Sequence, residues 1–140
     1  MNKPLKRCRI SAIAVAVLVG LLSVSVIPAG AEELVVEQVT ISVDVADREP
    51  VDPGNSFPAS VARLYCVTKV AGAMSPTDVT HVWYFGEVER ARISLAVAGS
   101  PWRTYSSKRL QPNEVGPWHV DILDGIGNTI KTIKFDITPG

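Results

Sequence analysis

Apolar and polar residues that alternate with a period of two are the feature of this sequence that most constrains its fold. The pattern is clearest at residues 39–45, 91–97 and 132–137, where an apolar residue stands at every second position. Successive side chains of a β-strand point to opposite faces, so this period places one set in a core and the other in water. The sequence therefore predicts half-buried strands of an antiparallel sheet.

Four further stretches are predicted as strands, and clusters of turn residues separate them. These strands cover residues 61–70, 79–85, 102–109 and 118–123. Between them lie groups rich in Pro, Gly, Asn and Asp, which favour turns because they fix the backbone angle φ or tolerate a positive one. About seven short strands with such turns predict an all-β fold, an antiparallel β-sandwich of immunoglobulin-like type. The stretch from Asp47 to Pro58 contains three prolines and is expected to be a long crossing loop.

The first 31 residues have the pattern of an export signal. Residues 1–9 contain four basic residues and no acid, residues 10–31 carry no charge, and this stretch ends at Ala29-Gly30-Ala31. A basic start, an apolar middle and a small-residue exit predict a cleaved signal peptide, and hence a periplasmic or extracellular protein. The alternative is an uncleaved membrane anchor, because the uncharged stretch is close to the ~20 residues that a helix needs to cross a bilayer.

The remaining residues, 32–140, have the length of one domain. We expect the first strand and the long loop at residues 32–60, and the core of the domain at residues 61–140. The whole chain has 14 basic and 14 acidic residues, and the signal holds four of the basic ones, so residues 32–140 carry a formal charge of −4. This balance offers no basic field for nucleic acid, which is not an expected partner.

Cysteine and histidine provide no sign of a disulfide, a metal or another cofactor. Cys66 is the only cysteine after residue 31, so this part of the chain cannot form an internal disulfide. No His-x-His or Cys-x-x-Cys spacing is present, and none of the constellations that hold zinc is recognisable. Cys66 and Trp83 are similar in placement to the core cysteine and tryptophan of immunoglobulin domains, and Trp118 could fill the place of the second cysteine.

An ordered set of motifs runs from about Val61 to the end of the chain. It begins with Leu-Tyr-Cys-Val-Thr at residues 64–68, His-Val-Trp-Tyr at 81–84 and Trp-Arg-Thr-Tyr-Ser-Ser-Lys at 102–108. Gly-Pro-Trp-His-Val-Asp at 116–121 follows, with Gly-Asn at 127–128 and Phe135 closing the set. This order resembles the bacterial family known as domain of unknown function 2914. The resemblance implies a secreted or envelope domain and no activity, because the family has none assigned.

Aromatic and cationic side chains concentrate in three of the predicted strands. Tyr, Trp and Arg are the residue types that most often anchor protein interfaces. We therefore predict a binding surface for an envelope protein, a peptide or a glycan, although a tryptophan of a small sandwich can equally belong to the core. The candidate residues are His81, Tyr84, Trp102, Arg103, Tyr105, Ser106, Lys108 and Trp118.

A catalytic function has weaker support in the sequence. Ser106 or Ser107 could act as a nucleophile with His81 or His119, but no nucleophile elbow surrounds either serine. Nor does Lys108 have the Ser-x-x-Lys spacing of a serine–lysine pair. The sequence favours a non-catalytic binding domain and leaves a small secreted hydrolase and a purely structural accessory domain as alternatives.

The strand at residues 102–109 also allows a prediction of faces. Alternation places Trp102, Thr104, Ser106 and Lys108 on one face and Arg103, Tyr105, Ser107 and Arg109 on the other. The core is expected to take the face of Trp102 and Thr104. A planar guanidinium is suited to a carboxylate, so an acidic partner or Asp121 within the fold is the expected match for Arg103.

Overall fold

The computed structural model describes residue 20 and residues 33–140, and this part of the chain is all-β. The signal peptide expected at residues 1–31 lies outside the described residues except for Gly20, so its presence stays a prediction. Among the residues that the structure describes, no helix is both long enough and apolar enough to cross a membrane.

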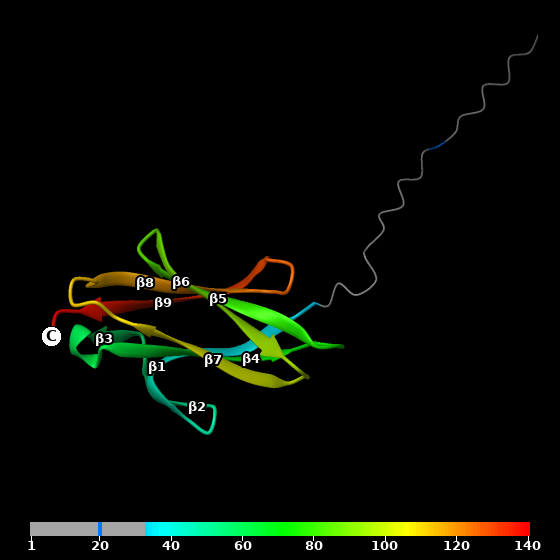
Figure 1. Ribbon diagram of the computed structural model, residues 1–140, viewed down its shortest axis with the longest axis horizontal. Coiled ribbons are helices and arrows are strands. Elements are labelled where there is room, and N and C mark those ends of the chain that lie inside the picture. The colour runs from blue at the N-terminus through cyan, green and yellow to red at the C-terminus, as the bar shows by residue number, and fades with distance from the viewer. Residues whose placement is uncertain (1–19, 21–32) are drawn as a thin grey trace, which may run out of the picture.

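Nine strands in the described residues form two sheets that pack face to face (Figure 1). The first sheet has the order β2-β1-β4-β7, with β1 at Val35–Ala46, β2 at Glu49–Gly54, β4 at Arg63–Ala71 and β7 at Trp102–Arg109. The second has the order β3-β9-β8-β5-β6, with β3 at Ser56–Pro58, β5 at Thr77–Phe85, β6 at Val88–Val97, β8 at Gly116–Leu123 and β9 at Thr129–Thr138. Neighbouring strands are antiparallel except β3 and β9, which are parallel.

The stretch from Asp47 to Pro58, expected to be a loop, instead contains β2 and β3. Asp47 and Arg48 both have positive φ values, 50° and 62°, which allow the tight turn between β1 and β2. Proline lacks the N–H that a central strand must donate, but β2 lies at the edge of its sheet and so tolerates Pro50 and Pro53. β3 then crosses to the second sheet. Six of the seven predicted strands lie within the remaining strands of the structure, and the seventh, residues 61–70, overlaps β4 but begins two residues too early, because Val61 ends a short 3-10 helix.

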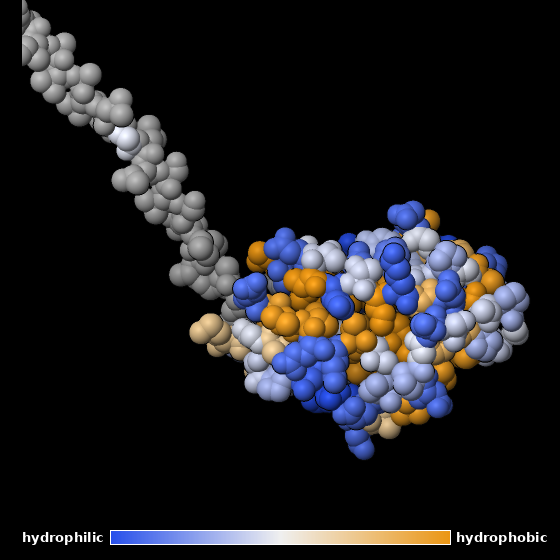
Figure 2. All heavy atoms as spheres, turned by 180° about the vertical axis from the view of Figure 1, so that it is seen from behind, coloured by the Kyte–Doolittle hydropathy of each residue, from blue (hydrophilic) through white to orange (hydrophobic). Residues whose placement is uncertain are grey.

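The core lies between the two sheets and contains the tryptophans. Trp83 and Trp118 are fully buried, and each ring lies 6.1 Å from the ring of Phe135, measured between centroids. Cys66 is also fully buried, and its burial raises the pKa of the thiol well above its usual range. The cysteine therefore behaves as a small hydrophobic residue. Figure 2 shows the domain from behind, where apolar side chains reach the surface between polar ones.

Candidate functional site

The residues predicted to form a binding surface lie in several separate environments. His81, Ser106 and Trp118 are buried in the core. Trp102 is half-buried and packs against the core. Lys108 Nζ lies 6.0 Å from the centroid of the Trp118 ring. Of the remaining three, Arg103 and Tyr105 lie on the outer face of the first sheet, and Tyr84 lies on the outer face of the second. The structure therefore does not bring these residues together on one face.

Four of the buried side chains form a hydrogen-bonded group between the sheets, called here the buried polar cluster: Thr68, His81, Trp83 and Ser106. His81 Nδ1 lies 2.6 Å from Ser106 Oγ, and its Nε2 lies 3.2 Å from Thr68 Oγ1. Trp83 Nε1 donates to Ser106 Oγ over 3.0 Å. Because β5 carries His81 and Trp83 while β4 and β7 carry the hydroxyls, the cluster connects the two sheets.

A single arrangement of protons satisfies every member of the buried polar cluster. Trp83 donates to Ser106, whose hydroxyl donates to His81 Nδ1, and His81 Nε2 donates to Thr68. The Thr68 hydroxyl then donates to the backbone oxygen of Thr104 over 3.5 Å. Burial lowers the pKa of His81 to about 4, so the imidazole is neutral at pH 7, as this arrangement requires. Buried polar groups cost little free energy when all of them are paired.

The contact between Ser106 and His81 has the distance of a nucleophile and its base, but its surroundings do not suit catalysis. Ser106 is 4% exposed and His81 is fully buried, so no substrate can reach either group. The second ring nitrogen of His81 contacts Thr68 rather than the carboxylate that orients the base of a triad. Among the described residues, no group of three or more His, Cys, Asp or Glu side chains could hold a metal ion. The cluster is therefore a structural feature of the core.

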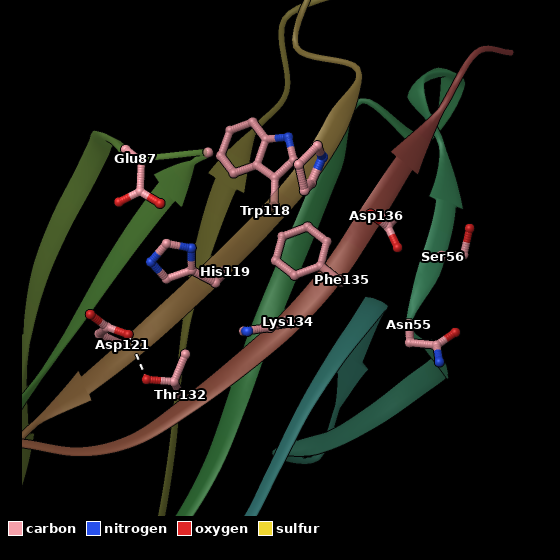
Figure 3. A pocket seen from close by; sticks show the side chains of 12 residues that line it. Asn55, Ser56, Glu87, Trp118, His119, Asp121, Thr132, Lys134, Phe135 and Asp136 are labelled. Atoms are coloured by element: carbon pink, nitrogen blue, oxygen red, sulfur yellow. Dashed lines mark hydrogen bonds between the residues drawn. The ribbon is translucent and has the colours of Figure 1, made fainter.

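A shallow pocket of about 690 Å³ lies on the outer face of the second sheet, mainly over β8 and β9 (Figure 3). We call this pocket the concave surface. The β5–β6 turn contributes Gly86 and Glu87 to it, Ser56 comes from the start of β3, and Asn55 comes directly before β3. The polar side chains that line it are Asn55, Ser56, Glu87, His119, Asp121, Thr132, Lys134 and Asp136.

Strand alternation explains why these polar groups share the concave surface. Trp118 and Val120 of β8 point into the core, so His119 and Asp121 point outward. Lys134 of β9 is directly opposite His119 in the register of the two strands. On the other side, Tyr84 of β5 is also opposite His119, and the two rings stack 4.6 Å apart at 9°. Of the four outward-facing residues, only Tyr84 is among the binding residues predicted from the sequence, yet the polar positions of the same alternation indicate His119, Asp121 and Lys134.

The charged groups of the concave surface are largely unpaired. Asp121 accepts a hydrogen bond of 2.7 Å from the hydroxyl of Thr132. In the described part of the chain, the side chains of Glu87, Lys134 and Asp136 form neither an ion pair nor a hydrogen bond, and all three are exposed. The surface thus offers three carboxylates and one ammonium group, together with the half-buried ring of His119, which stacks on the neighbouring Tyr84.

The outer face of the first sheet holds the other predicted residues. Arg103 and Tyr105 point outward as expected, and Tyr105 is 43% exposed. Arg103 does not contact Asp121, which lies in the other sheet. Its guanidinium instead contacts Glu49 Oε2 at 3.1 Å. Glu49 is available because residues 49–54, expected to be part of a loop, form the edge strand β2 of the same sheet.

Replacing Arg103 with alanine is expected to change the free energy of unfolding by less than about 1 kcal/mol, because exposed ion pairs contribute little. The Arg103 and Glu49 side chains are 29% and 59% exposed, so no buried charge is left without a partner. Urea denaturation of the Arg103→Ala and Glu49→Ala variants measures the effect. A loss of several kcal/mol in either variant would show that the pair is a structural anchor.

A scan against family models matches residues 76–137 to the family described as "Protein of unknown function (DUF2914)". The matched segment extends from the start of β5 through most of β9 and includes the concave-surface residues of β8 and β9. The motif at residues 64–68, which the sequence-based resemblance included, lies outside the match. A search of curated proteins finds no match to the chain.

Proposed function

We propose that this chain, which belongs to the DUF2914 family through residues 76–137, is a non-catalytic binding domain of the bacterial cell envelope or secreted fraction. The observation that carries the proposal is the concave surface, with its unpaired charged groups and with His119, whose ring stacks on the neighbouring Tyr84. The inaccessible Ser106–His81 pair argues against the hydrolase alternative. The basic start and small-residue exit of residues 1–31 support export.

A glycan is the ligand class that the concave surface fits best. A sugar carries many hydroxyl groups, which can donate to the carboxylates of Glu87 and Asp136 and accept from the ammonium group of Lys134. The pocket of about 690 Å³ lies within the size range of ligand sites. Its open shape suits a segment of an extended polymer, with one sugar ring lying beside His119.

We also infer that the fold is of the immunoglobulin-like type. The order β1-β4-β7 corresponds to strands A, B and E of such a domain, and β9-β8-β5 corresponds to strands G, F and C. Cys66 on β4 and Trp83 on β5 then occupy the strands that carry the core cysteine and tryptophan of antibody domains. No counterpart of strand D is found among the described residues, because the chain passes from β6 directly to β7.

Soluble oligosaccharides released from bacterial cell walls are expected to bind the concave surface. Titration followed by NMR should shift the amide signals of β8 and β9, and Lys134→Ala or His119→Ala should weaken binding at least tenfold, as expected for the loss of about 1.4 kcal/mol. Tyr105→Ala, on the opposite sheet, is the matched control and should bind normally. Shifts that appear only with short peptides would replace the glycan by a peptide ligand, and no shift with either probe would refute the proposal.

A further inference from the structure

Two arginines stand directly opposite each other on the outer face of the first sheet. Arg63 of β4 and Arg109 of β7 are partners in the register of these strands, and both are exposed. Leu64 on β4 is fully buried, so the neighbouring Arg63 points away from the core. Like charges in directly opposed positions of a sheet destabilise it. The arrangement is therefore unfavourable for the domain alone.

No acidic side chain compensates this pair in the described part of the chain. The ion pairs found there use other basic residues, namely Lys69, Arg90, Arg92 and Arg103. Asp44 on the neighbouring strand β1 accepts a hydrogen bond from the backbone N–H of Val45 and forms no ion pair with Arg63. Two guanidinium groups thus remain available to an anion from outside.

A serine hydroxyl and two tyrosine rings lie beside the two arginines and add a hydrogen-bond donor and an aromatic surface to them. Arg63 Nη1 donates to Ser107 Oγ over 2.9 Å, which leaves the hydroxyl proton of Ser107 free to donate to a ligand. Tyr65 and Tyr105 lie next to them on the same face, with their rings in edge contact at 6.2 Å between centroids. An apolar or ring-shaped part of a ligand can pack against the exposed ring of Tyr105 and the accessible part of the half-buried Tyr65.

Protection of a sheet edge does not account for both arginines. Basic residues on an edge strand discourage pairing with another chain, and β7 is an edge strand, so this role would explain Arg109. Arg63, however, lies on the interior strand β4, which pairs with β7 at this position, two residues beyond the end of its pairing with β1 at Tyr65. Protection of the β7 edge therefore does not explain why a second arginine stands opposite Arg109.

We propose that Arg63 and Arg109 together bind an oxyanion, a phosphate or a carboxylate, of a ligand whose ring packs on Tyr65 and Tyr105. The planar fork of each guanidinium can donate two parallel hydrogen bonds to such a group. The bound anion would remove the repulsion between the two arginines. This site lies on the sheet opposite the concave surface, and its test is independent of the proposed glycan site.

Phenyl phosphate and benzoate are suitable probes, because each joins an oxyanion to a ring. Titration at low ionic strength, followed by NMR, is expected to shift the amide signals of Tyr65, Tyr105 and Ser107. Phenol, which lacks the oxyanion, should leave them unchanged. A response to phenyl phosphate alone identifies phosphate as the ligand group, and a response to benzoate alone identifies a carboxylate. If neither probe shifts these signals, the proposal is wrong.

Three variants separate a site from general charge attraction. Arg63→Gln and Arg109→Gln should each weaken binding of the probe at least fivefold. Arg92→Gln removes the same charge from the second sheet, where Arg92 pairs with Glu89, and should bind the probe normally. The melting temperature of Arg109→Gln should be unchanged or raised, because a repulsion is relieved. Equal weakening by Arg92→Gln would overturn the proposal, as would a lowered melting temperature of Arg109→Gln with unchanged binding.

Discussion

Replacing Trp83 with alanine is expected to lower the free energy of unfolding by about 3–5 kcal/mol, the usual cost of removing a large buried ring. Trp83 is fully buried, meets the ring of Phe135 edge-on and donates to Ser106 in the buried polar cluster. The substitution would leave a cavity between the sheets and remove one hydrogen bond of the cluster. A domain of this size has only about 5–15 kcal/mol of stability in total, so urea denaturation should show a large shift of the midpoint.

Two further variants test the reason for this loss. Trp83→Phe keeps much of the ring volume while losing the N–H donor, so its destabilisation should be clearly smaller than that of Trp83→Ala. Trp102→Ala is the matched control at a half-buried position, where Arg48 covers the ring. If Trp102→Ala were as destabilising as Trp83→Ala, the tryptophan at position 83 would not be the centre of the core.

Acidification is expected to destabilise the domain through His81. Burial lowers its pKa from 6.5 to about 4 in the folded chain, whereas the unfolded chain takes up the proton at the ordinary value. Between these two values the unfolded state binds more protons, so stability is fully present above pH 6.5 and decreases as the pH falls toward 4. The total loss is about 3 kcal/mol, of which about 2 kcal/mol should be visible in urea denaturation between pH 7.5 and pH 5.

The second histidine of the chain provides the control for this pH effect. His119 lies half-buried on the outer face of the second sheet, so His119→Gln should retain the decrease of stability on acidification. His81→Gln should be less stable at pH 7.5, because the buried polar cluster is disrupted, but its stability should change much less between the two pH values. Equal stability of the unmodified protein at pH 7.5 and pH 5 would contradict the assignment.

The alternation of residue types predicted most strands because it is a local property. In β4, alternation puts Leu64, Cys66 and Thr68 on one face of the strand, and all three are fully buried. The same rule failed for β2 and β3, where the prolines suggested a loop. β3 is a strand only because it pairs with β9, far away in the sequence, and no local pattern records that pairing.

The candidate site is harder to predict than the strands, because residue type alone does not say to which face of a strand a side chain points. The chemistry of His81 and Trp118 favours a binding role, but both side chains stand at inward positions of their strands and are buried. His119 and Asp121, at outward positions of β8, received no binding role. The concave surface also needs Asn55, which β3 brings beside β9, and this proximity depends on the pairing of distant segments.

The place of β9 in the second sheet has a consequence for how the domain folds. β9 is the last described strand, yet it lies between β8 and β3 and contributes Phe135, which contacts the rings of Trp83 and Trp118. A growing chain that lacks β9 cannot cover these two tryptophans. Proteins dominated by pairings between distant segments fold slowly, and incomplete forms expose apolar surface that promotes aggregation. Folding of this domain should therefore be completed only when β9 docks, and earlier intermediates should bind chaperones and apolar dyes.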